Sequence, residues 1–230
     1  MRPRGRPVKD PSHNGRKQLL EAAMTLFAEQ GISATSVADI AAHAGVTPAM
    51  VHYYFKNREQ LLDAVVEERL QEFISFVWDP VSEGGDDPLA MLTGLVHRIM
   101  KVTDQMPCIP SLWVQEVLSE GGLLRERVLK RLPVNKLKHI SNSISIAQSR
   151  GSINPEIDPA LVVLSVVGLT MIPLAAPKIW HRLPNVERLN KEILSRHVVA
   201  LLAYGLSNPQ RKHRGKTTQK SGGRDAKNLL

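Results

Sequence analysis

The sequence predicts an all-α protein. Aromatic residues make up only 4% of the chain, and no segment alternates apolar and polar residues at period two, so a β-rich fold is disfavoured. Apolar residues instead recur every three to four positions between Pro and Gly residues, which is the spacing of amphipathic helices. Since 43% of the 230 residues are hydrophobic, the chain can bury a substantial core.

The N-terminal segment, residues 1–13, is a basic arm, and we do not expect its first nine residues to be helical. It begins MRPRGRPVK, and its prolines and Gly5 favour an extended chain. This stretch resembles the core of an AT-hook, in which Arg4 and Arg6 would enter a narrow A·T minor groove. The alternative is a disordered leader that adds only non-specific affinity for phosphate.

A first helix is expected over residues 14–30. Leu19, Leu20, Ala23, Leu26 and Phe27 form its apolar face, and Gly31 can end it. This helix would serve as scaffold for the segment that follows.

Residues 35–58 have the pattern of two short helices joined by a tight turn. Ser36 can cap the first helix, and Asp39 can return the bond as in a capping box. Gly45 allows the positive φ that the turn requires. Thr47 can cap the second helix, and Pro48 suits its first position. The spacing therefore predicts a helix-turn-helix.

The second of these helices has an inner and an outer face. We expect the inner face to comprise Met50, Val51, Tyr54 and Phe55. The outer face would then comprise Pro48, Ala49, His52, Tyr53 and Lys56. Asn57 can cap a third helix, with Gln60 at the reciprocal position.

The segment from Ser36 to Leu62 resembles the TetR/AcrR family of transcriptional repressors. Its residues follow the pattern S-V-x-D-I-A-x-x-A-G-V-T-P-x-x-V-H-Y-Y-F-x-N-R-x-x-L-L. Two positions depart from the family: His52 replaces a tyrosine that usually contacts phosphate, and Arg58 replaces a common lysine. Both replacements can still donate a hydrogen bond to phosphate. The resemblance implies that the second helix enters the major groove of DNA.

The DNA contacts divide into two groups. Thr47, Ala49 and Tyr53 are the candidates for base edges or the thymine methyl group, and Pro48 would add a shape contact. An exposed tyrosine without a DNA role is the alternative for Tyr53. The phosphate candidates are Ser36, His52, Tyr54, Lys56 and Arg58. Replacement of Arg58 is expected to weaken binding alike on all DNA sequences.

A long helix from residue 58 to about residue 78 connects the front domain to the rest. Its buried stripe would comprise Leu61, Leu62, Val65, Val66, Leu70, Phe73 and Val77. A linker at 79–88 follows, then helices at about 88–105, 110–119, 121–150, 158–180 and 185–205. Pro133 is expected to kink or split the third of these. We therefore assign 14–74 to a DNA-binding domain, 75–206 to a rear domain and 207–230 to a disordered basic tail.

Residues 160–177 contain no charged side chain. A membrane span is one interpretation, but the prolines and the short length weaken it. A helix buried on two sides is the other. The family resemblance implies a homodimer formed by the last two helices as a four-helix bundle, which would read a pseudo-palindromic DNA operator. We therefore expect no membrane partner.

The rear domain is where the resemblance implies a small-molecule effector, which we expect to be apolar. An apolar cavity could be lined by Met91, Leu95, Met100, Trp113, Met171 and Trp180, with His97 or Glu116 as a polar anchor. Core packing explains the same residues equally well. Cys108 could be a redox-sensing thiol or an inert one, and no nearby Lys or Arg would lower its pKa.

The net charge of +8 resides in the two ends of the chain. Residues 1–17 carry six basic residues against one acidic, and 207–230 carry seven against one, whereas the segment between them has 17 basic and 20 acidic residues. Attraction to phosphate should then come from the arms and a few placed donors. An architectural DNA-binding protein dominated by these basic tails is the alternative function.

Catalysis is not expected. The sequence lacks a Gly-rich phosphate loop, a G-x-S-x-G elbow and an H-E-x-x-H motif, and its eight histidines lack ligand spacing. We therefore predict no enzymatic activity, cofactor or metal. One cysteine and no visible signal peptide favour the reducing cytoplasm. The resemblance to the TetR/AcrR family implies a transcriptional regulator that is released from DNA by a ligand.

Overall fold

The computed structural model describes residues 11–82, 87–180, 182 and 190–209, with side chains from residue 15 onward except those of Ser82 and Trp180. The predicted arm contacts of Arg4 and Arg6 and most of the predicted tail lie outside these residues. The described part consists of helices and one isolated bridge between Ile153 and Ser207, and it contains no β-strand. The all-α prediction is confirmed.

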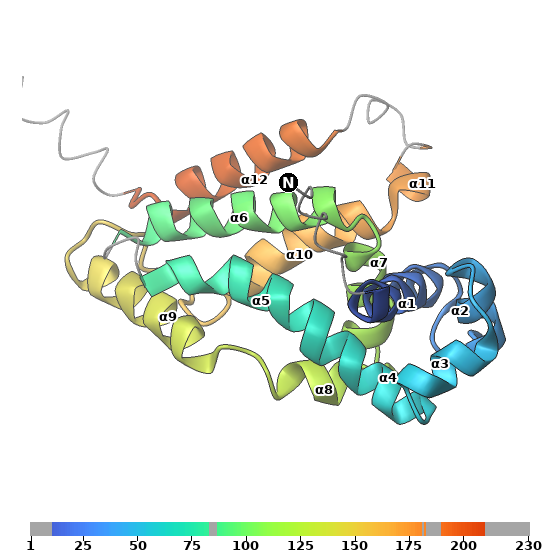
Figure 1. Ribbon diagram of the computed structural model, residues 1–230. Helices are drawn as coiled ribbons and strands as arrows, with labels where there is room; N and C mark the ends of the chain where they lie inside the picture. The colour runs from blue at the N-terminus through green and yellow to red at the C-terminus, as the bar shows by residue number, and fades with distance from the viewer. Residues whose placement is uncertain (1–10, 83–86, 181, 183–189, 210–230) are drawn as a thin grey trace, which may run out of the picture.

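The helices fall into a front group and a rear group (Figure 1). The front group comprises α1 (Pro11–Gln30), α2 (Val37–His43), α3 (Pro48–Tyr54) and α4 (Arg58–Ala64). The chain continues through the π-helical turn η1 (Val65–Leu70), α5 (Gln71–Trp78) and the 3₁₀ turn η2 (Asp79–Ser82). The rear group comprises α6 (Pro88–Gln105), α7 (Ile109–Trp113), the π-helical turn η3 (Val114–Leu118), α8 (Arg125–Leu129), α9 (Val134–Ser149), α10 (Val162–Ala175), α11 (Pro177–Trp180) and α12 (Lys191–Leu206).

Helix α1 is the scaffold of the front group. Its side chains Leu19, Leu20, Ala23 and Phe27 are at most 1% exposed, and the helix ends at Gly31 with φ +83°. It packs against α2 and η1 and also against α7 of the rear group. One helix therefore contacts both parts of the molecule, and the buried residues form a single continuous cluster.

The predicted long helix runs from Arg58 to Trp78 as expected, but not as a regular α-helix. Its middle turn, η1, is π-helical, and the sequence pattern did not reveal this. The predicted apolar stripe is buried or half-buried along its whole length. Arg69 of the same turn is only 9% exposed and pairs with Glu21 of α1 and Glu72, both at 3.0 Å. The connector is thus tied to α1 by charge as well as by apolar contact.

Two of the predicted rear helices are each interrupted at a proline, and only the interruption at Pro133 was expected. Residues 121–150 form α8 and α9, separated at Pro133, which is the split that the sequence allowed. Residues 158–180 form α10 and α11, separated at Ala176, whose φ of −125° and ψ of 48° lie outside the helical region. Pro177 accounts for this break, since a proline disfavours helical geometry in the residue before it. Over the described residues, no helix has the length and apolar character required to span a bilayer.

Helix α6 is the centre of the rear group. Leu92, Leu95, Val96 and Ile99 are at most 1% exposed, because α5, α9, α10 and α12 pack around the helix. Helix α12 begins at an Asn190 cap that accepts a hydrogen bond from the Ile193 N–H at 2.8 Å, later than the predicted start at 185. Most of the intervening residues, 183–189, lie outside the described part.

Candidate nucleic-acid interface and rear cavity

The first helix of the helix-turn-helix begins with the predicted capping box. The Asp39 N–H donates to Ser36 Oγ at 3.1 Å, and Asp39 Oδ2 accepts from the Ser36 N–H at 2.9 Å and from Ser36 Oγ at 2.6 Å. These hydrogen bonds from Ser36 lower the pKa of the Asp39 carboxyl group below its ordinary value. The Ser36 hydroxyl proton is therefore already donated to Asp39, so a phosphate contact by Ser36 would require that bond to exchange.

The turn between α2 and α3 has the predicted glycine conformation. Gly45 has φ +69° with open space around it, so backbone geometry and not crowding selects glycine. Thr47 holds the N-cap position and Pro48 the first helical position, as predicted. Within the described structure the Thr47 side chain makes no capping bond, contrary to its expected capping role. Its hydroxyl is consequently not committed to the helix start.

The outer face of α3 is exposed as predicted. Pro48, Ala49, His52 and Lys56 are all exposed, and Tyr53 has 77% of its surface accessible. The inner face is narrower than predicted: it comprises Val51 and Phe55, each at most 2% exposed, with half-buried Tyr54. Met50 was predicted to face inward, but it is 38% exposed. Because α3 has only seven residues, two side chains one turn apart suffice to anchor it.

Tyr54 lies against α1 and not on the outer face. Its hydroxyl is close to Gly15, where an added Cβ atom would lie 3.1 Å from the oxygen. Its ring makes an edge-to-face contact with Tyr53 at 5.2 Å between centroids and a tilted contact with Phe55 at 6.3 Å. A phosphate contact by Tyr54 would therefore come from the boundary between α1 and α3.

Arg16, which was counted above only in the basic charge of residues 1–17, is a structural residue. Its guanidinium group binds the Glu68 carboxylate at 2.5–3.0 Å and donates to the Tyr54 carbonyl oxygen at 3.0 Å. It also lies 4.4 Å from the centroid of the Phe55 ring. Arg16 thereby connects α1, the end of α3 and η1, and its charge is neutralised within the fold.

Arg58 also has a structural partner. Its Nη2 donates to the Ile32 carbonyl oxygen in the loop between α1 and α2. The rest of the residue is exposed at the start of α4, where Asn57 accepts from the Gln60 N–H at 2.9 Å as predicted. The predicted phosphate contact of Arg58 thus competes with, or shares, a hydrogen bond within the domain.

A partly open apolar cavity of about 580 Å³, a size typical of ligand sites, lies between the connector helix and the rear group. Of the predicted lining residues, Trp113 and Met171 contact it. Met91, Leu95 and Met100 are buried in the core outside the described lining, so core packing explains them. The Trp180 side chain lies outside the described residues.

Neither predicted polar anchor lies at the cavity. His97 is exposed, because it faces away from the core on the outer side of α6. Glu116 is only 7% exposed, but its carboxylate accepts from the backbone N–H groups of Ile32 and Leu123, both at 3.0 Å. The polar lining is instead provided by Arg125, Lys138 and Ser141, which sequence spacing did not indicate.

Cys108 is half-buried between α6 and α7. Burial raises the pKa of its thiol, and the nearby Glu29 charge raises it further. A raised pKa disfavours the reactive thiolate, so the environment favours the inert alternative. Within the described ranges, no group of three or more His, Cys, Asp or Glu side chains is placed to hold a metal ion.

The helix-turn-helix has clear relatives. Residues 19–65 match the family model described as bacterial regulatory proteins, tetR family. The HTH-type transcriptional repressor KstR2 of Mycolicibacterium smegmatis is 24% identical over 198 residues, which span 85% of this chain and 92% of the repressor. Residues 19–65 therefore form a DNA-binding domain of the tetR-family type, and the chain as a whole resembles transcriptional regulators that carry this domain.

Solved structures of family members share the fold. The ketosteroid transcriptional regulator KstR2 of Mycobacterium tuberculosis superimposes with a TM-score of 0.67 at 20% identity, over 87% of this chain and 97% of that one. AibR, solved in complex with isovaleryl coenzyme A and operator DNA, has a TM-score of 0.64 at 23% identity, over 81% of this chain and 97% of its own. The family fold therefore extends through the rear group as well as the helix-turn-helix.

The capping box of this TetR-family domain has a pH dependence that can be tested. The pKa of Asp39 is lower in the folded state, so its carboxylate stabilises the fold at neutral pH, and this stabilisation is lost as the pH falls below about 4. Asp39→Asn is expected to lower the melting temperature at pH 7 and to have a progressively smaller effect toward pH 3. Thermal unfolding followed by circular dichroism at several pH values measures this, with the exposed Glu126→Gln as the control. An Asp39→Asn effect of equal size at pH 7 and pH 3 would contradict the assignment.

Proposed function

We propose that this chain is a homodimeric repressor that binds a pseudo-palindromic operator and leaves it when a ligand fills the rear cavity. The observation that carries the proposal is the outer face of α3. The exposed side chains there are those of Pro48, Ala49, His52, Tyr53 and Lys56. The other side of α3 is anchored in the core by Val51 and Phe55. Short helices presented in this way insert into the major groove.

The proposed contacts follow from the position of each side chain. Thr47, Ala49 and Tyr53 would face base edges, since they lie at the start and along the outer face of α3. Pro48 would give a shape contact beside them. The proposed phosphate contacts remain His52, Lys56, Arg58, Tyr54 and Ser36, and the Lys56 side chain is exposed. Met50 joins the exposed surface and could contact a thymine methyl group.

The DNA proposal is tested by the salt dependence of binding. Lys56→Ala is expected to weaken binding to all duplexes and to reduce the slope of log K against log salt by about one unit. Arg58→Ala should have the same effect and should also lower the melting temperature, because its bond to Ile32 is lost. Fluorescence anisotropy with a duplex selected from a random pool provides the measurement.

Lys130→Gln removes a cation from the rear group and serves as the control for net charge. An unchanged slope for Lys56→Ala would show that Lys56 does not contact a phosphate. If the selected pool shows no sequence preference, or if the preference depends entirely on residues 1–10 and 210–230, the architectural alternative would replace the repressor.

The dimer interface that we propose is formed by α10 and α12, which pack side by side. Their outer surfaces expose large apolar side chains with accessible fractions of 36–76%, namely Leu161, Leu164, Leu169, Ile172, Leu201 and Tyr204. Gly168 and Gly205 lie on these helices, and a Cβ atom added at either would meet no other atom within 4 Å. This space would permit close approach of a second helix pair. An apolar surface of this kind is typical of a subunit interface.

Leu201→Glu tests the interface. A charge at the centre of an apolar helix–helix contact should convert the dimer to a monomer, because the carboxylate would be buried without a partner. Light scattering coupled to size-exclusion chromatography measures the mass. Ile146→Glu places the same charge on α9, where the isoleucine is 50% exposed, and should remain dimeric. A Leu201→Glu variant that remains dimeric would exclude α12 from the interface.

The effector that best fits the cavity is an acyl-coenzyme A thioester. The lining is almost entirely apolar, which suits an acyl chain, whereas Arg125 and Lys138 can face the phosphates of coenzyme A. The structure of AibR with isovaleryl coenzyme A supports this chemical class. Release follows if the ligand binds the released form more tightly than the DNA-bound form.

Octanoyl-coenzyme A is the probe for this proposal. It should raise the melting temperature of the protein, whereas coenzyme A alone or octanoate alone should have a much smaller effect. Arg125→Gln should weaken octanoyl-coenzyme A binding about tenfold or more, since a charge-assisted hydrogen bond to phosphate is lost. Isothermal titration calorimetry gives the affinities, with Lys130→Gln as the matched control. Equal affinity of the wild type and Arg125→Gln would place the phosphates elsewhere.

A further inference from the structure

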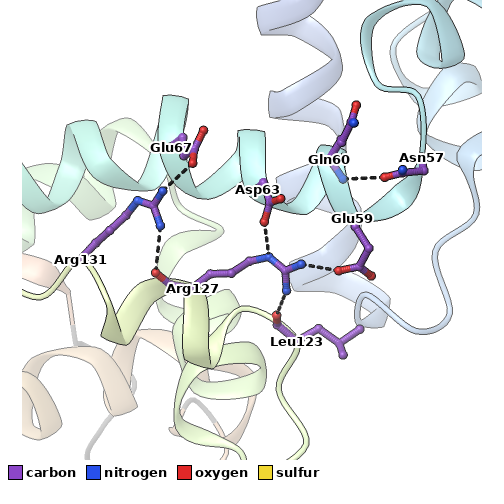
Figure 2. A network of polar contacts seen from close by, with 8 residues as sticks. All are labelled: Asn57, Glu59, Gln60, Asp63, Glu67, Leu123, Arg127 and Arg131. Carbon is purple, nitrogen blue, oxygen red and sulfur yellow. Dashed lines mark hydrogen bonds and ion pairs between the residues drawn. The ribbon is translucent and has the colours of Figure 1, made fainter.

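Helix α8 has two faces with different neighbours. Arg125, Val128 and Leu129 line the rear cavity. Arg127, and Arg131 just beyond the helix, face α4 and η1 of the connector helix (Figure 2). A helix of five residues is therefore both a wall of the ligand site and a neighbour of the DNA-binding domain.

The Arg127 guanidinium group has three partners. Its Nε donates to Asp63 Oδ1 at 2.7 Å, its Nη2 binds Glu59 Oε2, and its Nη1 donates to the Leu123 carbonyl oxygen at 2.9 Å. Burial lowers the pKa of Arg127, but the two carboxylates outweigh this effect and the pKa is raised overall. Arg131 adds a parallel contact, with Nη2 at 2.6 Å from Glu67 Oε1.

Leu123 continues this chain of hydrogen bonds toward α1. Its carbonyl oxygen accepts from Arg127, and its N–H donates to Glu116 Oε2 at 3.0 Å. The other oxygen of the same carboxylate, Glu116 Oε1, accepts from the Ile32 N–H at 3.0 Å. The buried Glu116 carboxylate therefore links the loop after α1 to the residues immediately before α8.

The turn that carries Glu116 is itself a cavity wall. Trp113, Val117 and Leu118 line the cavity, whereas the adjacent Gln115 donates to the Ala28 carbonyl oxygen of α1 at 3.3 Å. Gly122 allows the close approach of this turn to α8, because a Cβ atom there would lie 2.3 Å from the Glu116 carbonyl oxygen. Any ligand that displaces this wall must also disturb the contacts to α1 or α4.

Besides its contacts with α4, helix α8 packs against η1 and η3, which are both π-helical turns. A π-turn has an i→i+5 hydrogen-bond pattern that is less favourable than the α-helical one, and such turns occur at functional sites. Helix α8 therefore lies against one π-helical turn of the connector helix and one of the rear group.

We propose that the hydrogen-bonded chain from Ile32 through Glu116, Leu123 and Arg127 to Glu59 and Asp63 transmits occupancy of the cavity to the DNA-binding domain. Arg127 is its positioning residue: it lies outside the described cavity lining and outside the proposed DNA contacts, and it makes α4 follow the movement of α8. The inference rests on the proposed release by ligand, but it assigns the transmission to one side chain. Without Arg127, α8 can move while α4 stays in place.

The measured quantity is the release factor, defined as the Kd for the selected duplex with saturating octanoyl-coenzyme A divided by the Kd without it. Coupling between sites typically gives factors of about 5–150. Arg127→Gln should reduce the release factor at least about fivefold, while the Kd for DNA alone and the Kd for octanoyl-coenzyme A each stay within about threefold of the wild type. Arg127→Lys, which keeps the charge but cannot reach three partners, should give an intermediate factor.

Lys130→Gln is the matched control, because it removes an exposed cation from the end of the same helix. It should keep the wild-type release factor. Melting temperatures of all variants verify folding. Hydrogen exchange gives a readout that does not depend on DNA: octanoyl-coenzyme A should speed exchange of the Ile32 and Leu123 amides in the wild type, since Glu116 binds both.

A second experiment replaces the ligand with a larger side chain in the wall of the cavity. Leu137 of α9 lines the cavity, so Leu137→Trp should fill part of it. It should weaken DNA binding at least about fivefold in the wild-type background and less than about twofold in the Arg127→Gln background. This double-mutant cycle reports the route even if octanoyl-coenzyme A is the wrong effector.

The outcomes separate the two proposals. If octanoyl-coenzyme A has no effect on the wild type but the cycle shows coupling, the effector class is wrong and the route stands. If Arg127→Gln keeps the wild-type release factor, or if Leu137→Trp weakens DNA binding equally in both backgrounds or not at all, the route is overturned. Loss of the release factor in Lys130→Gln as well would also overturn it, because the effect would then follow net charge.

Discussion

The burial of α1 between two groups of helices is the constraint on which the rest of the structure depends. Phe27 and its apolar neighbours are fully covered because α2 and η1 pack on one side of the helix and α7 on the other. The orientation of α3 is defined relative to α1, through Tyr54 and Arg16. The orientation of the cavity wall is defined relative to α1 too, through Gln115 and Glu116. A single buried helix thus relates the proposed DNA-binding surface to the wall of the cavity.

The arginines of the folded part mostly serve the structure. Arg16, Arg69, Arg127 and Arg131 each bind at least one carboxylate from a distant part of the chain. Their charges are therefore neutralised locally, and the segment between the ends carries more acidic than basic residues. Non-specific attraction to DNA is then left to a small number of exposed cations and to the chain ends. Such an arrangement favours DNA recognition by individually positioned side chains over attraction by the net charge of the folded surface.

Local features of the interface were predictable, whereas distant partners were not. The capping box of Ser36 and Asp39, the positive φ of Gly45 and the Asn57 cap involve residues at most three positions apart, so the pattern of residue types predicted them correctly. The partners of Glu116 and Arg127 lie up to 84 and 68 positions away. Glu116 was offered as a possible anchor for a ligand, because nothing local in the sequence identified Ile32 as its partner. The exposure of Met50 and His97 was missed because helical periodicity identifies the apolar face of a helix but not how many of its residues are buried.

The sequence alone determined the helical class, the helix-turn-helix and the residues on its outer face, because capping, turn geometry and helical spacing act over a few residues. Only the tertiary structure decided where the cavity lies, which cations border it and how the cavity wall meets the DNA-binding domain. Those features arise where α5, α8, α9 and α10 converge, and they depend on helices separated by tens of residues. Long-range packing and ion pairing select among many arrangements that the same local pattern would allow.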